Sequence, residues 1–225
     1  MRTYFKYILS SIFSKNRSKG FTRTPKSLVS GFTLLELLVV ITISTIITTA
    51  LVIQNRQWND QLTVNTQRYE LALMLRQAQV YSLAVREDMA GTGDKFDIGY
   101  GVHVSVSNNN RYIFFADRNR NKKYDTGEEI EEGIKTLNRG VYISKLCAIK
   151  DGVEKCTGQP GIGALKQISV SFFRPNPAAI VSFINDGGNI INPPEHFPPA
   201  TIYLRSPGGH ESSIKIEANG QISTQ

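Results

Sequence analysis

The sequence predicts an α+β protein in which a long N-terminal helix packs on a C-terminal antiparallel β-sheet domain. Two observations carry this prediction. Apolar residues recur with helical spacing as far as Met89, and no proline interrupts residues 32–89. Beyond Gly91 the hydrophobic period changes to two, and turn clusters rich in Asn, Asp and Gly separate short apolar segments.

The helix opens with an apolar run from Phe32 to Ile53 that contains a single charged residue, Glu36. Roughly 20 such residues suffice to span a bilayer as a helix. A cleavable secretory signal is the competing interpretation, but it would have a shorter apolar core and a small-residue exit site. Seven Lys and Arg residues lie in the segment 1–31, before the apolar run. Positive charge on this side predicts that the N-terminus stays in the cytoplasm and that everything after Ile53 lies outside.

Beyond the membrane the predicted helix is amphipathic, and one apolar stripe at helical spacing faces the expected core. The stripe consists of Leu71, Met74, Leu75, Ala78, Tyr81, Ser82, Val85 and Met89. The polar residues Gln67, Glu70, Gln77 and Arg86 are expected on the remaining surface of this helix.

Short strands joined by tight turns should follow the helix, and Asn219-Gly220 is a typical type I′ hairpin pair. The predicted strands are 101–107, 112–116, 130–136, 141–149, 168–173, 179–184, 201–205, 213–217 and 221–223. Such a pattern predicts one antiparallel sheet that covers the helix with one face and meets solvent with the other.

The charge distribution restricts the function. The formal net charge is +7, and residues 1–31 contain basic side chains but no acid. Without that leader the chain is neutral, which argues against nucleic acid as a partner, because DNA capture needs converging Lys and Arg side chains. Nucleophile-elbow, phosphate-loop and zinc-protease motifs are also missing from the sequence, so we do not expect an enzyme.

Glu36 is a candidate functional residue, because an unpaired carboxylate in a spanning helix is costly. Thr42, Thr45 and Thr49 share one helical face. Small hydroxyl residues there allow close helix packing in lipid, although the hydroxyls can instead bond to their own backbone.

The string Gly-Phe-Thr-Leu-Leu-Glu at 31–36, followed by the apolar helix, resembles the N-terminal signature of type IV prepilins and type II secretion pseudopilins. The segment LRQAQVYSLAVRED at 75–88 is similar to a helix of the GspH/FimT-like minor pseudopilins. The resemblance implies that a prepilin peptidase cleaves between Gly31 and Phe32 and that Phe32 is then N-methylated. It also implies that Glu36 pairs with the Phe32 ammonium of a neighbouring subunit in a helical filament.

On this interpretation the chain has four parts: a cleaved cytoplasmic leader (1–31), a transmembrane and polymerisation helix (32–53), its amphipathic extension (54–90) and an extracytoplasmic β-rich domain (91–225). The expected function is that of a structural minor pilin or pseudopilin. It would reside in the bacterial inner membrane and then in a type IV pilus or type II secretion filament. The alternative is a filament-tip binding module for DNA uptake or adhesion.

One loop has the ligand spacing of a calcium site, where a hard cation needs six to eight oxygens. The oxygens would come from Asp117, Asn119, Asn121, the Lys123 carbonyl, Asp125 and Glu128, at loop positions 1, 3, 5, 7, 9 and 12. Position 6 is Lys122, where glycine normally permits the sharp turn, and cationic neighbours should lower the affinity. The alternative is a plain polar turn between strands.

The two cysteines, Cys147 and Cys156, lie close together in the part that we expect to be exported. This spacing suits a disulfide that closes a short loop in an oxidising compartment, and two free thiols are the alternative. The three histidines show no zinc-ligand spacing to these cysteines, so no zinc site is predicted.

Overall fold

The structure is a computed structural model of the chain. It describes residues 31–84, 98–150, 153–159, 165–191 and 199–225. Contacts divide the chain into two compact units, Met1–Ile47 and Thr48–Gln225. The elements are α1 (Leu34–Leu83), β1 (Gly99–Ser105), β2 (Arg111–Asp117), β3 (Glu129–Thr136), β4 (Tyr142–Lys150), β5 (Val153–Cys156), β6 (Gln167–Phe173), β7 (Asn176–Ile184), β8 (Ala200–Arg205), β9 (Glu211–Ile216) and β10 (Ile222–Thr224).

Helix α1 begins with a hydrogen-bonded cap in the first unit. The Oγ1 of Thr33 accepts a hydrogen bond from the backbone N–H of Glu36 at 3.2 Å, and the Thr33 carbonyl accepts one from Leu37 at 3.1 Å. This is the bonding of a Thr N-cap, which satisfies a donor that the first helical turn would otherwise leave free. The same helix is long and apolar enough to cross a membrane, as the sequence predicts.

The threonines of the apolar run satisfy their hydroxyls within the helix. Thr42 donates to the carbonyl of Val39 at 2.8 Å, and Thr45 donates to the carbonyl of Thr42 at the same distance. The backbone-bonded alternative is therefore confirmed for these two residues. Such bonding leaves their methyl groups on the helix surface and hides the polar atom.

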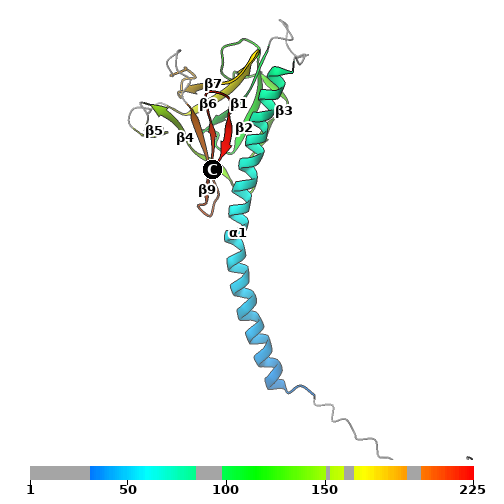
Figure 1. Cartoon of the computed structure of the whole chain (residues 1–225). Coiled ribbons are helices and arrows are strands. Elements are labelled where there is room, and N and C mark those ends of the chain that lie inside the picture. Colours follow the sequence, from blue (N-terminus) through cyan, green and yellow to red (C-terminus); the bar gives the residue numbers. More distant parts are fainter. Residues whose placement is uncertain (1–30, 85–97, 151–152, 160–164, 192–198) are drawn as a thin grey trace, which may run out of the picture. The chain divides into compact units, whose positions relative to one another are not determined.

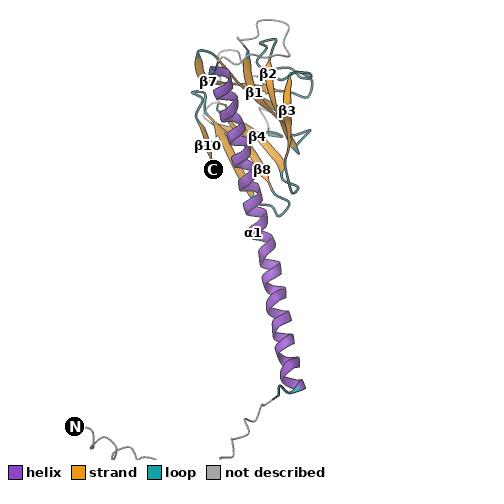
Figure 2. Cartoon of the chain, turned by 90° about the vertical axis from the view of Figure 1, so that its right-hand side faces the viewer, coloured by secondary structure: helices purple, strands orange, loops and turns teal. Residues whose placement is uncertain are grey.

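The second unit contains two antiparallel sheets (Figures 1 and 2). Sheet A has the order β3-β2-β1-β6-β7 and sheet B the order β10-β9-β8-β4-β5. The predicted α+β fold, with a long helix on antiparallel strands, is confirmed. The strands form two sheets where the sequence indicated one, because hydrophobic periodicity identifies strands but not their partners. Strand β5 was also missed, since it is short and its Glu154 and Lys155 interrupt any apolar pattern.

The helix packs on the sheets through the predicted stripe. Leu71, Leu75 and Ala78 are fully buried in one core shared with both sheets, and Met74 and Tyr81 pack against it. Val85 and Met89 lie outside the described residues. Figure 2 shows the C-terminal part of α1 running alongside the strands of both sheets. The amphipathic pattern therefore identified the buried face correctly.

Gln67 departs from the prediction, because it is buried rather than exposed. Its side-chain nitrogen donates to Glu70 at 2.8 Å, and its side-chain oxygen accepts the backbone N–H of Asn138 at 3.2 Å. A buried amide is tolerated when both of its ends are hydrogen bonded. The second bond comes from a turn 71 residues further along the chain, which helical periodicity cannot reveal.

The opposite side of this part of the helix remains apolar. Large side chains lie exposed on it at a spacing of four, seven or eleven residues: Trp58, Leu62, Tyr69, Leu73 and Val80. Each of them is more than half exposed. The helix of the second unit therefore carries two apolar faces, of which only one is covered by the sheets.

Candidate functional site

The predicted processing site lies just before the helix. Phe32 is 80% exposed, and a side chain added at Gly31 would meet no atom within 4 Å. The fold itself therefore does not require glycine at position 31. Among the described residues nothing requires a small residue there, whereas cleavage by a peptidase would.

Glu36 occupies the first turn of α1, where the N-terminal end of the helix dipole favours a negative charge. Thr33 and Glu36 stand in the T-x-x-E spacing of a capping box, although the observed bond is from the Glu36 backbone to the Thr33 hydroxyl. The Glu36 carboxylate could therefore cap the start of α1 within its own chain, besides pairing with another subunit. The sequence analysis missed this capping role, although the T-x-x-E spacing of Thr33 and Glu36 indicates it.

The second candidate site is the loop between β2 and β3. The first residue of the loop, Asp117, is fully buried and holds the turn by hydrogen bonds to the backbone. Its Oδ1 accepts the N–H of Asn121 at 3.1 Å, and its Oδ2 accepts the N–H of Lys122 at 2.7 Å. Burial raises the pKa of the Asp117 carboxyl to about 6, the two backbone bonds oppose that shift, and the nearby charge of Glu128 adds to it.

The backbone of the loop turns in the left-handed region at Arg120 (φ 59°) and at Lys122 (φ 66°). Residues other than glycine and asparagine rarely adopt this conformation, because the Cβ atom crowds the carbonyl oxygen. The lysine at position 6 therefore makes the sharp turn for which calcium loops normally use glycine.

Glu128 closes the loop at position 12. It is 6% exposed, its Oε1 accepts the backbone N–H of Arg118 at 3.1 Å, and its Oε2 accepts that of Asp125 at 3.0 Å. Two carboxylates, Asp117 and Glu128, are thus buried near each other with backbone amides as partners. Buried carboxylates close together are unfavourable when both are charged, unless a cation lies near them.

The Asp125 carboxylate faces its own loop. The amides of Asn119 and Asn121 both donate to its Oδ2, and the Lys123 Nζ lies 3.2 Å from its Oδ1. Burial acts to raise the pKa of the Asp125 carboxyl, but the bonds from Asn119 and Asn121 together with Lys123 outweigh it and keep that pKa below its usual value. In this arrangement the carboxylates of Asp117, Asp125 and Glu128 do not converge on one point.

The loop also covers the outer face of sheet A. The N–H of Tyr124 donates to the Ser169 Oγ on β6 at 3.1 Å, and the hydroxyl of Ser182 on β7 donates to the Lys122 carbonyl at 2.6 Å. Beneath it, every residue of β1 is buried. The prediction that one face of the sheet meets solvent was therefore wrong for these central strands, because the loop takes the place of solvent.

A family model described as the prokaryotic N-terminal methylation motif matches residues 26–52. The chain carries the motif of type IV pilin-like prepilins. The resemblance seen in the sequence is thus confirmed for the prepilin motif. No curated protein matches the chain, and no solved structure does.

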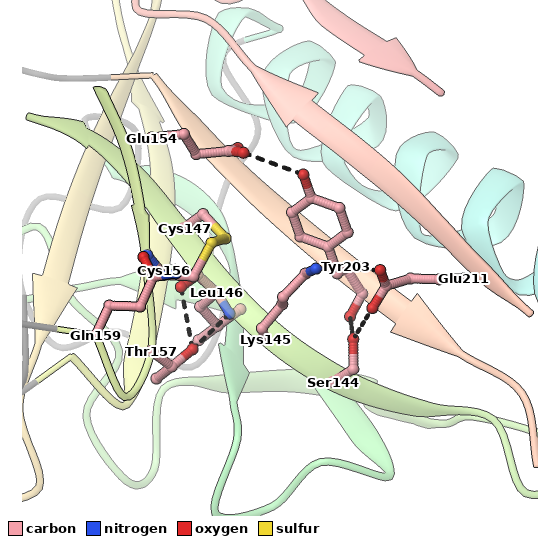
Figure 3. Close-up of a disulfide and its surroundings, with 10 residues drawn as sticks. All are labelled: Ser144, Lys145, Leu146, Cys147, Glu154, Cys156, Thr157, Gln159, Tyr203 and Glu211. Atoms are coloured by element: carbon pink, nitrogen blue, oxygen red, sulfur yellow. Dashed lines mark hydrogen bonds and ion pairs between the residues drawn. A yellow bond between two sulfur atoms is a disulfide. The ribbon is translucent and has the colours of Figure 1, made fainter. Parts of the chain in front are cut away.

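The cysteines of this pilin-like chain form the predicted disulfide (Figure 3). Cys147 on β4 and Cys156 on β5 are register partners in sheet B, so the bond joins two neighbouring strands. Within the described residues, the metal-ligating side chains that gather in threes are Cys147, Glu154 and Cys156. Because both sulfurs are in the disulfide, neither offers a thiolate, and this group gives no metal site.

Proposed function

We propose that the protein is a structural subunit of a type IV pilus or type II secretion filament, a minor pilin or pseudopilin. A prepilin peptidase would cleave it after Gly31 and methylate Phe32, and the processed chain would assemble through α1. The observation that carries the proposal is the methylation motif at 26–52 on a helix that is apolar enough to span the inner membrane.

The uncovered face of α1 in the second unit supports assembly. Tyr69, Leu73 and Val80 are exposed although their neighbours on the other face are in the core. Contiguous exposed apolar surface of this kind marks an interaction site. In a filament, the helix of another subunit would cover this face.

A structural role is favoured over a DNA-uptake module, which would need a basic surface. Basic and acidic residues are equal in number after residue 31, and the loop cation Lys123 is paired with Asp125. Nucleic-acid affinity depends on several unpaired Lys and Arg side chains that face the same way.

As a second function, we propose that the 117–128 loop binds one calcium ion, with Asp117, Asn119, Asn121, Asp125, Glu128 and the Lys123 carbonyl as ligands. The supporting observation is the left-handed backbone at Lys122 and its N–H bond to Asp117, which give position 6 the turn that such loops require. Binding would require Asp125 to exchange its bonds to Asn119 and Asn121 for the ion. Calcium would also compensate the two buried carboxylates.

The experiment that tests the main proposal is mass measurement of membrane-extracted protein. The mature chain should begin at Phe32 and carry an added methyl group. Gly31→Val should leave the full-length precursor, because the peptidase needs a small residue, and it should leave the fold intact, since position 31 has open space around it. Gly187→Val, at an exposed glycine without a positive φ and far from the junction, is the matched control and should be processed normally. A mature start near residue 54 would refute the proposal.

A further inference from the structure

The uncovered side of α1 in the second unit carries large apolar side chains at a repeat of eleven residues. Trp58, Tyr69 and Val80 follow one another at this interval. Leu62 and Leu73 are separated by the same interval, and all five side chains are more than half exposed. Eleven residues make three helical turns with about 20° left over, so these five residues form a nearly straight line along the helix, the outer stripe.

A seven-residue repeat does not describe this side of the helix. A heptad continued from Trp58 reaches Asn65, Ala72 and Gln79. Ala72 is buried in the core, and the side chains of Asn65 and Gln79 are hydrogen bonded to residues of the β-domain. The sheets therefore occupy the heptad positions, and the 11-residue positions stay open. A repeat of eleven residues favours a right-handed crossing with a partner helix, whereas heptads give the left-handed one.

The shape and area of the outer stripe suit a second helix. From Trp58 to Val80 it extends about 33 Å, at about 1.5 Å per residue. Its exposed side chains offer roughly 500 Å² of apolar surface per chain. Two such stripes would bury about 1,000 Å² together, which is the lower limit of a specific interface. A pair formed through them therefore needs further help, which anchoring of both chains in one membrane would supply.

Opposite charges lie on the two sides of the outer stripe. At about 100° per residue, Arg76 lies on the side of Trp58, and Glu70 lies beyond Leu73 on the other side. Both charged residues are exposed. Each makes a hydrogen bond within its own chain, and neither forms an ion pair with a described residue. When two parallel helices pack face to face, opposite flanks meet, so Glu70 of each copy faces Arg76 of the other.

We propose that two copies of this chain pair through their outer stripes as a parallel, in-register dimer with a right-handed crossing. The inference rests on the proposed function in one respect, the anchoring of each copy by its apolar run. Identical anchors in one membrane make the two helices parallel and hold them at the same depth. Leu62 and Leu73 then each meet the same residue of the second copy. A second copy is the occupant because the charges beside the stripe complement each other when the stripe faces itself.

Disulfide cross-linking of the full-length protein in membranes tests the pairing, in cells that make no other filament subunit. The native cysteines are already joined, so mild oxidation with copper phenanthroline can link chains through one introduced cysteine. Leu62→Cys and Leu73→Cys should each give a linked dimer. Gln61→Cys is the matched control, because it is exposed at the same depth on a different side of the helix, and it should stay monomeric.

A charge placed in the stripe should break the pair. Leu73→Glu, added to Leu62→Cys, should lower the linked fraction at least about tenfold, because the two introduced carboxylates would meet each other. Gln77→Glu adds the same charge at an exposed position outside the stripe and should not lower it. Leu73 is exposed, so the variant should fold, as a thermal melt of the extracted protein shows. If it does not fold, the three single-cysteine variants decide.

Equal linking of Gln61→Cys and Leu62→Cys would reflect random collision and would overturn the dimer. Linking of neither leucine variant, or linking of the two only when other filament subunits are present, would overturn it as well. Failure of the dimer is distinguishable from failure of the proposed function. A chain that is processed to begin at Phe32 but does not link is still a prepilin-type subunit without self-pairing. A chain that links but is not processed keeps the dimer and refutes the pilin proposal.

Discussion

The Nδ1 of His103 lies 2.9 Å from the Oγ of Ser169, its register partner on the neighbouring strand, and both side chains are buried. The same Oγ accepts the backbone N–H of Tyr124 from the loop above. One serine thus connects the sheet, a neutral histidine and the 117–128 loop. This arrangement makes the stability of the domain depend on pH.

The first prediction concerns that dependence. The pKa of His103 is about 4 in the folded state and 6.5 in the unfolded state, so the unfolded chain takes up the proton first as the pH falls. The stabilisation is complete above pH 6.5 and is lost progressively down to pH 4, amounting to about 2 kcal/mol between pH 7 and pH 5. His103→Gln should remove this loss, as measured by urea unfolding of the full-length protein at both pH values.

Asp117 acts in the opposite direction over the same range. Its pKa is raised to about 6, so its contribution to stability grows as the pH falls from 6 to 4. Comparing the His103 variant with the wild type cancels this effect, because Asp117 is present in both. An equal pH dependence in the two proteins would contradict the prediction.

The second prediction concerns the strained turn. Lys122→Gly should raise the free energy of unfolding by about 0.5–1 kcal/mol, because glycine adopts a φ of 66° without the Cβ penalty that lysine carries. Lys135→Gly is the matched control in the regular strand β3, where the same change should lower stability by about 0.5–1 kcal/mol. Destabilisation by both changes would show that the side chain of Lys122 contributes more than its backbone costs.

The third prediction tests calcium binding. With a Kd of about 10⁻⁴–10⁻³ M, calcium at about 10 mM should stabilise the folded protein by about 1.4–2.7 kcal/mol and raise its Tm by several degrees. Asp125→Asn should reduce this shift, because it removes the ligand charge at loop position 9, whereas Asp186→Asn at an exposed turn should not. Magnesium should stabilise much less, since it requires a tighter octahedral shell. Equal effects of both ions, or none, would exclude the site.

The fourth prediction separates two roles of Glu36. Glu36→Val removes both the charge and any capping function, and should prevent incorporation into filaments without affecting membrane insertion or cleavage. Glu36→Gln keeps a polar side chain that suits the capping box but loses the charge. If pairing with a neighbour's ammonium is decisive, both variants should fail to assemble, as measured by the amount of subunit in sheared filaments. Assembly of the Gln variant alone would assign Glu36 to helix capping.

The sequence identified features that depend on local order, and it missed those that depend on distant partners. The stripe through Leu71 and Leu75 was found because helical spacing directly reports a buried face. The disulfide followed from two nearby cysteines. The burial of Gln67 could not be foreseen, because its side-chain oxygen accepts the N–H of Asn138. Only tertiary packing brings this distant turn to the helix.

The 117–128 loop obtains its final contacts from strands that follow it by many residues. Ser169 and Ser182 bond to it, and the Lys123 Nζ lies 3.3 Å from the Gly188 carbonyl. In the proposed topology the N-terminus stays in the cytoplasm and the chain behind α1 crosses the membrane in sequence order, so that β2, β3 and the loop would emerge before any of these partners. In that topology the loop would lack these contacts until residue 188 has crossed, and its completion would be a late event of folding.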